Sequence, residues 1–192
     1  PPSSVFGNSM VKSGSNLILG WTPATDNVGV AGYYIYRSTT PVFTASLSNR
    51  VGSSPTNSYT DAGALAAADS YYYKVKAYDA AGNESVQASN MGYKLNKNME
   101  FGAGRPNINW LSIPNITPYK KAADIAADIP NAILVSGLNP ATQQFEDYFK
   151  TQSGIWLGNN FNIVTGESYA VVIEANSPSR LVGWHKPHQI NM

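Results

Sequence analysis

The residues of this sequence that could carry catalysis are few and poorly spaced. Residues 166–170 (GESYA) come close to the G-x-S-x-G nucleophile elbow. That elbow places its serine between a buried strand and a helix, whereas a β-rich stretch follows here. His185 and His188 have the spacing of paired metal ligands, but Lys186-Pro187 between them prevents a helix and no third ligand stands nearby. We therefore expect a plain structural segment at the first motif and an exposed C-terminal segment at the second.

The absence of cysteine narrows the chemistry further. With no Cys among 192 residues, the chain has no disulfide, thiolate metal site or cysteine nucleophile. An acid–base enzyme would then need paired carboxylates, and Asp124 and Asp128 lie four residues apart, on one face of a predicted helix. Such a pair on a helix surface is ordinarily solvated charge. We predict that the chain is not an enzyme and that it holds no cofactor, with a bound calcium ion as the single exception to consider.

Two loops carry the oxygen atoms that a calcium ion would need. Asp26 and Asn27 follow one predicted strand, and Asp79 and Asn83 follow another. In a β-sandwich these loops lie at the same end, so carboxylate and amide oxygens could surround Ca²⁺. The alternative is that the same side chains form Asx turns that fix the two loops. The sequence favours the Asx turns and leaves calcium as a weaker hypothesis.

Tyrosines gather on neighbouring predicted strands and offer a binding surface. Strand alternation places Tyr72 and Tyr78 on the face opposite to the core, and Tyr34 joins them from the adjacent strand. Exposed aromatic rings stack on sugars or become buried against a protein partner. Cross-strand tyrosine pairs also stabilise a sheet without binding anything. Both interpretations of Tyr34, Tyr72 and Tyr78 stay open.

The elements that must position these residues are short strands separated by turns. Residues 17–21 (LILGW), 31–37 (AGYYIYR) and 71–79 (YYYKVKAYD) alternate apolar and polar positions or are rich in aromatic and β-branched residues. Segments rich in Pro, Asn, Asp, Ser and Gly lie between them. The pattern over residues 1–92 predicts a mainly β fold, a sandwich or barrel.

This first half resembles a bacterial fibronectin type III domain. The resemblance is carried by LILGW, TPATDNVGVAGYYIYRS, NSYTDAG and YYYKVKAYDAAGNES, in that order, between residues 17 and 85. It implies a β-sandwich with Trp21 in the core. It also implies a tyrosine corner made by Leu65 and Tyr71, although Ala67 stands where the family usually has proline.

The second half shows mixed signals and begins after a predicted linker at residues 93–106, where Lys, Asn and Gly accumulate. Over residues 107–192 we predict a small β-rich domain with one helix. The helix is expected near residues 119–129, with Thr117 as N-cap and Pro118 at its first position. Strands are expected at residues 108–113, 132–138, 143–149, 168–174 and 181–184.

This half resembles a module found in bacterial secreted and surface proteins, whose function is not settled. The matching residues are 109–114 (NWLSIP), 139–143 (NPATQ) and 166–169 (GESY). The resemblance implies a location at the cell surface or outside the cell and says little about activity.

The composition excludes two classes of partner. The net charge is +1 and no basic stripe is present, so the electrostatic term that dominates nucleic-acid binding is missing. No apolar run approaches the ~20 residues that cross a bilayer. Only 13% of residues are charged, against about 25% in an average soluble domain. A neutral surface rich in Asn, Ser and Thr favours an extracellular or cell-surface location.

Two functions fit these observations. The first is a non-catalytic structural or interaction protein of a cell-surface or secreted assembly, acting in adhesion, spacing or self-assembly through protein contacts. The alternative is a carbohydrate-binding accessory module of a secreted hydrolase, with polysaccharide as the partner. The fold alone does not decide between them.

Overall fold

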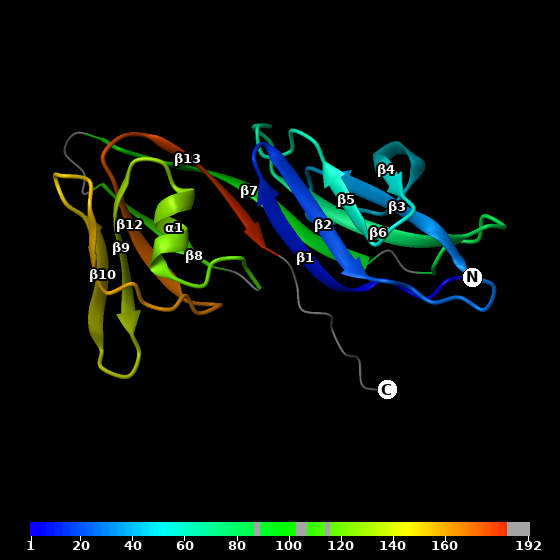
Figure 1. Cartoon of the computed structure of the whole chain (residues 1–192). Helices are drawn as coiled ribbons and strands as arrows, with labels where there is room; N and C mark the ends of the chain where they lie inside the picture. The colour runs from blue at the N-terminus through cyan, green and yellow to red at the C-terminus, as the bar shows by residue number, and fades with distance from the viewer. Residues whose placement is uncertain (87–88, 103–106, 114–115, 184–192) are drawn as a thin grey trace. The chain divides into compact units, whose positions relative to one another are not determined.

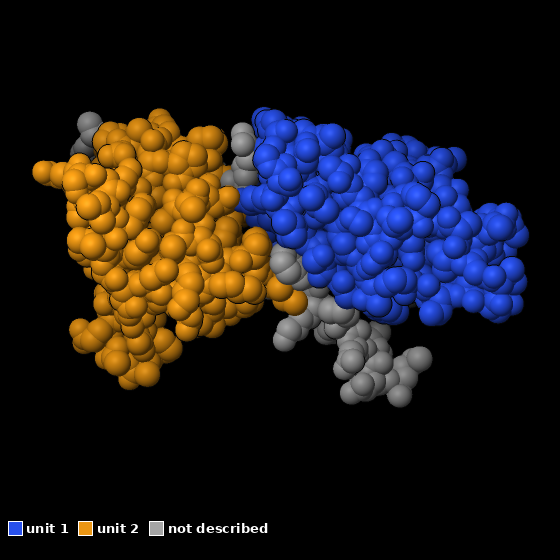
Figure 2. Space-filling view, in the orientation of Figure 1, with its two compact units in different colours: residues 1–95, 182–192 blue, residues 96–181 orange. Residues whose placement is uncertain are grey.

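A computed structural model describes residues 1–86, 89–102, 107–113 and 116–183 of the chain. It contains two compact units (Figure 2). Unit 1 comprises Pro1–Leu95 with the chain from Val182 onward, and unit 2 comprises Asn96–Leu181. Within the described residues no helix has the length and apolar character that crossing a membrane requires. The predicted fold class is confirmed, because antiparallel strands dominate and the one α-helix in the described part of the chain lies in the second half.

Unit 1 is built from two antiparallel sheets and one 3-10 turn, η1 (Figure 1). One sheet has three strands in the order β1-β2-β5, and the other has five in the order β13-β7-β6-β3-β4. The elements are β1 (Phe6–Ser13), β2 (Asn16–Thr22), β3 (Val30–Ser38), η1 (Leu47–Asn49), β4 (Arg50–Ser54), β5 (Ser58–Asp61) and β6 (Tyr71–Asp79). Two further strands, β7 (Ser89–Met99) and β13 (Ser177–Gly183), belong partly to unit 1 and partly to unit 2.

The core of unit 1 lies between the two sheets. Strand β2 buries Leu17, Leu19 and Trp21, and Trp21 meets Tyr33 of β3 edge to face at 5.2 Å between ring centroids. Strand β6 alternates strictly, with the core side chains two residues apart from Tyr73 onward. This period of two is what a half-buried strand requires. The buried Trp21 of the fibronectin type III resemblance therefore lies where it was predicted.

The predicted tyrosine corner of Leu65 and Tyr71 stays a prediction, although both residues pack on the core of unit 1. Leu65 is buried, but Tyr71 is only half-buried, with the Arg37 guanidinium 4.2 Å from its ring centroid. The fully buried tyrosine is Tyr73, whose hydroxyl donates to Asp61 at 2.8 Å. Asp61 also accepts two hydrogen bonds from Arg37, at 3.0 and 2.8 Å. The buried Asp61 carboxylate thus links Arg37 of β3 to Tyr73 of β6.

Unit 2 contains a five-stranded antiparallel sheet in the order β11-β10-β9-β12-β8. The helix α1 contacts β9 and buries Ala122 and Ile125 (Figure 1). The elements are β8 (Ile108–Ser112), α1 (Ala122–Asp128), β9 (Ala132–Asn139), β10 (Gln144–Lys150), β11 (Trp156–Gly158) and β12 (Ser168–Ile173).

The predicted helix and linker both began too early. The helix starts at Ala122 rather than near residue 119, because the Asp124 carboxylate accepts the backbone N–H groups of Lys120 and Lys121 and so fixes its first turn. Strand β7 continues through residues 93–99, inside the predicted linker at 93–106. Tyr93 and Lys94 are buried there, and the Lys94 ammonium donates to the carbonyl of Ala67 at 2.7 Å. Because Lys94 faces the core, the accumulation of Lys, Asn and Gly in this stretch did not indicate a solvent-exposed linker.

Candidate functional site

The structure gives the serine of the GESYA motif no catalytic surroundings. Ser168 opens β12, and its hydroxyl lies 2.8 Å from that of Ser112 on the neighbouring strand β8. Among the described residues no histidine stands near it, since His185 and His188 lie outside the described part of the chain. Ser168 therefore pairs two strands, as the structural interpretation of this motif predicted.

The two carboxylates of α1 have separate structural partners. Asp124 accepts the N–H groups that precede the helix, as described above. Asp128 accepts a short hydrogen bond from the Tyr119 hydroxyl. Burial, reinforced by the nearby Asp128 charge, raises the pKa of Tyr119 well above its ordinary value. The two side chains do not form an acid–base pair, and each fixes a turn of the polypeptide around α1.

The proposed calcium loops are held by Asx turns. Asp26 accepts the N–H groups of Val28 and Gly29 at 3.0 and 3.2 Å. Asp79 accepts the Asn83 side-chain amide at 2.8 Å and two backbone N–H groups. The strand register pairs Asp79 with Val30 and so brings both loops to one end of the sandwich. No group of three or more His, Cys, Asp or Glu that could hold a metal occurs within the described ranges. Asn27 is exposed, and calcium at Asp26, Asn27, Asp79 and Asn83 stays a prediction.

These turns make stability depend on pH in a defined direction. The Asn83 side-chain amide first, and backbone N–H groups with it, hold the pKa of Asp79 below its ordinary value. Hydrogen bonds from Val28 and Gly29 lower the pKa of Asp26. A lowered folded-state pKa adds stability that is present above the unfolded-state pKa of about 3.9 and is lost as the pH falls through the folded value.

We predict that the urea midpoint of unfolding falls as the pH is lowered from about 5 to about 2, and that Asp79→Asn flattens this dependence. Urea denaturation at a series of pH values measures it. The matched control is Asp69→Asn, which changes an exposed carboxylate with no hydrogen bond in the described part of the chain. An unchanged slope in the Asp79 variant would show that these turns do not carry the effect.

The predicted tyrosine surface is present, but two of its three rings stack on each other. Tyr34 and Tyr78 lie 4.1 Å apart and nearly parallel, and Arg50 lies 4.4 Å from the Tyr34 ring centroid. Gly32 permits this stack, because a Cβ there would stand 2.6 Å from the Tyr78 hydroxyl. Tyr72 tilts against Tyr93 at 6.2 Å. The rings of Tyr34 and Tyr78 therefore support the sheet-stabilising interpretation, and a binding role of Tyr34, Tyr72 and Tyr78 stays a prediction.

A surface that sequence reasoning missed lies on the sheet of unit 2. The strand registers place five apolar side chains in one row across all five strands, one residue on each strand and each directly opposite the next. At about 4.8 Å per strand the row is about 19 Å wide. In spatial order its members are Ile108, Val172, Leu134, Phe149 and Leu157.

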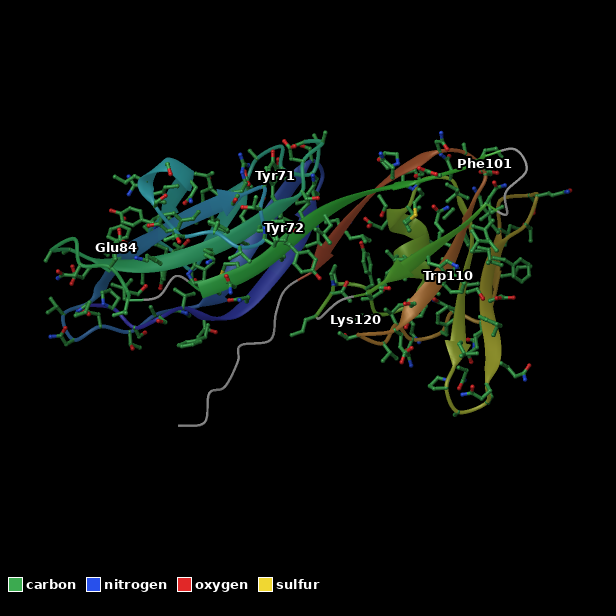
Figure 3. The ribbon with its side chains drawn as sticks, turned by 180° about the vertical axis from the view of Figure 1, so that it is seen from behind. Tyr71, Tyr72, Glu84, Phe101, Trp110 and Lys120 are labelled. Carbon is green, nitrogen blue, oxygen red and sulfur yellow. The ribbon has the colours of Figure 1, made fainter. Side chains whose placement is uncertain are left out.

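No member of this row is buried, and Leu157 is 49% exposed. Strand alternation places Trp110, Leu138 and Phe145 on the same side of the sheet, and Phe145 is 63% exposed. The opposite side carries Val135, which is fully buried, and faces α1. We call this side, on which no described helix or strand packs, the open face; it is defined by the row and these three residues, and Ala170 and Ser136 near its centre are buried. Figure 3 views the molecule from behind and labels Trp110 on β8.

Polar groups accompany the apolar row on the open face. The adjacent cross-strand row runs from Trp110 through Ala170 and Ser136 to Asp147. The hydroxyl pair of Ser112 and Ser168 lies beyond it. A signal for the open face was present in the sequence as the odd–even alternation of each strand. It could be combined into one surface only once the registers were known.

The chain is similar in sequence to parts of larger proteins that are named as enzymes. No family model matches it. It is 34% identical to an alpha-amylase of Niallia circulans over 81% of this chain, and 40% identical to chitinase A1 of Niallia circulans over 45%. It is 38% identical to exoglucanase B of Cellulomonas fimi over 41%. The chain spans only 12%, 11% and 6% of the lengths of these three proteins.

Among solved structures, chitinase ChiA74 from Bacillus thuringiensis overlays 97% of this chain and 27% of its own, with 22% identity and a TM-score of 0.38. A likeness at that level bears on neither fold nor function.

Proposed function

We propose that this chain is a non-catalytic accessory module of a larger secreted hydrolase and that it binds polysaccharide through the open face of unit 2. The relatives support a role outside the reaction, because they are named for three different activities and share only a small part of their length with the chain. Similarity shared with parts of an amylase, an exoglucanase and a chitinase does not depend on which bond each enzyme cleaves.

The open face is the observation that carries the proposal. A contiguous exposed apolar surface of this width marks a contact site on a soluble protein. Sugar rings present apolar C–H faces bordered by hydroxyl groups, and aromatic rings with nearby polar groups suit such ligands. The open face offers Phe145, Phe149 and Trp110 beside serine hydroxyls, and Asp147 is its one carboxylate among the rows described. A neutral polymer matches this weakly charged surface.

The same face also keeps a second function open, a protein contact within a surface assembly. Apolar exposed patches serve protein partners as well. The relatives give this interpretation no support, since their names are those of polysaccharide-degrading enzymes. Self-association of the chain is therefore treated as the outcome that would replace polysaccharide binding.

Co-sedimentation with insoluble chitin, cellulose and granular starch tests the proposal. We expect the chain to be depleted from the supernatant by at least one polymer, to release no sugar from any, and to remain a monomer in light scattering. A chain that stays in the supernatant with all three and forms a dimer through the open face would overturn polysaccharide binding in favour of a protein contact.

A further inference from the structure

Unit 2 has a cavity on the side of its sheet that faces α1, away from the open face. Its volume is about 360 Å³, which corresponds to about twelve water molecules at ~30 Å³ each. That lies in the range of small-molecule sites. The walls come from the start of α1, the turn between β9 and β10, and the segment between β11 and β12.

The apolar part of the cavity is formed by two stacked rings. Phe161 and Tyr169 lie 5.8 Å apart with an interplanar angle of 14°. Both rings lie against Gly137 of β9, where a Cβ would stand 2.9 Å from the Tyr169 ring and 3.0 Å from the Phe161 ring. Tyr169 is held in place because its hydroxyl accepts the Val164 N–H at 2.7 Å. Glycine in the middle of a strand is thus explained by the rings that line the cavity.

The polar part combines fixed and unengaged groups. The Asn139 side-chain amide donates to the Glu146 carboxylate at 3.0 Å, which orients both at the cavity wall. Asn159, Asn162 and Glu167 also line the cavity, and within the described ranges their side chains form no hydrogen bond. Amide groups of this kind offer a donor and an acceptor side by side, as neighbouring hydroxyl groups of a sugar require.

The charges of the lining indicate a neutral ligand. Two carboxylates, Glu146 and Glu167, oppose an anion, and the Lys121 ammonium opposes a cation. A polyhydroxyl ligand instead uses all three groups together with the asparagine amides, and the buried rings of Phe161 and Tyr169 form the apolar wall beside it. We propose that the cavity is a second carbohydrate site, which takes one or two sugar residues of a free chain end or a soluble oligosaccharide.

This inference rests on the proposed function, shares only Leu138 with the open face and takes a different physical form of the ligand. The open face would contact the flat surface of an insoluble polymer, whereas a cavity of about 360 Å³ suits a short soluble ligand. Binding of soluble oligosaccharide and retention on insoluble polymer are therefore separable measurements.

The test titrates the whole chain with maltotetraose, cellotetraose and N-acetylchitotetraose, followed by backbone amide NMR and calorimetry. We expect at least one to shift the amide signals of Gly137, Asn162 and Tyr169. The double variant Asn159→Ala/Asn162→Ala should bind it at least tenfold more weakly. The control Asn90→Ala changes an exposed asparagine of unit 1 and should leave binding unchanged. An unchanged near-ultraviolet circular dichroism spectrum shows that each variant is folded.

Three results would separate the two ideas. If no oligosaccharide shifts the cavity signals while insoluble polymer still retains the chain, the cavity site is overturned and the proposed function stands. If an oligosaccharide binds but the double variant binds it equally well, the ligand lies elsewhere and the cavity is again overturned. If neither soluble nor insoluble carbohydrate binds, the proposed function fails together with the inference.

Discussion

Changing Phe149 and Leu157 together to serine is expected to weaken binding of the chain to insoluble polysaccharide by about thirtyfold. The two side chains are direct cross-strand neighbours in the apolar row, and both are exposed. Covering a half-exposed side chain of this size contributes on the order of 1 kcal/mol each, which for the pair is about 2 kcal/mol and gives the stated factor. Depletion isotherms measured on the polymer that retains the unchanged chain provide the measurement.

The matched control removes apolar surface of similar size away from the open face. Val42 and Leu47 lie in unit 1, and Val42 is 90% exposed. The variant Val42→Ser/Leu47→Ser should bind as the unchanged chain does. Equal weakening by both double variants would mean that general surface hydrophobicity, rather than the open face, controls retention.

The largest stability effect is expected at the ion pair between Arg37, whose side chain is 29% exposed, and the buried Asp61 carboxylate of unit 1. Changing Arg37 to methionine should lower the free energy of unfolding by about 3 kcal/mol, because it leaves the buried Asp61 charge without its cation. Asp61 is 5% exposed and would retain only the Tyr73 hydroxyl as a side-chain partner among the contacts described. Burial of the Tyr73 hydroxyl, and after it the nearby Asp61 charge, raises the pKa of Tyr73 far above its ordinary value. Urea denaturation followed by circular dichroism measures the loss.

An ion pair whose carboxylate is more exposed provides the comparison. Lys76 and Glu84 lie 3.0 Å apart, and their side chains keep 20% and 35% of their exposure. Surface pairs of this kind contribute about 0–1 kcal/mol, so Lys76→Met should cost less than 1 kcal/mol. A loss at Arg37 as small as that at Lys76 would contradict the importance of the buried contact.

The fold of unit 1 could be predicted from sequence because its local signals agree with one another. Alternation in residues 71–79 and the turn residues around it indicate the same strand, and Trp21 falls on the buried face of its own strand. Local conformational preference and core packing then favour the same fold, a β-sandwich. The exception was Lys94, since no residue-level rule reveals that a lysine ammonium will reach buried carbonyl groups.

The helix boundary and the candidate surfaces were harder to predict from the sequence. Thr117 and Pro118 are good start signals, yet the Asp124 side chain fixes a start at Ala122, and both options satisfy the same capping chemistry. The open face needs the pairing of strands that are far apart in sequence, as Ile108 with Val172 shows. The cavity likewise depends on Gly137 meeting rings from two later segments.

Hydroxyl-radical footprinting of the chain bound to insoluble polysaccharide, read by mass spectrometry, tests the central claim most directly. We predict strong protection of Phe145, Phe149 and Leu157 relative to the unbound chain, with Tyr72 and Val42 in unit 1 labelled equally in both states. Unprotected open-face residues in a chain that is firmly bound, or protection confined to the tyrosine surface of unit 1, would contradict the assignment of polysaccharide binding to the open face.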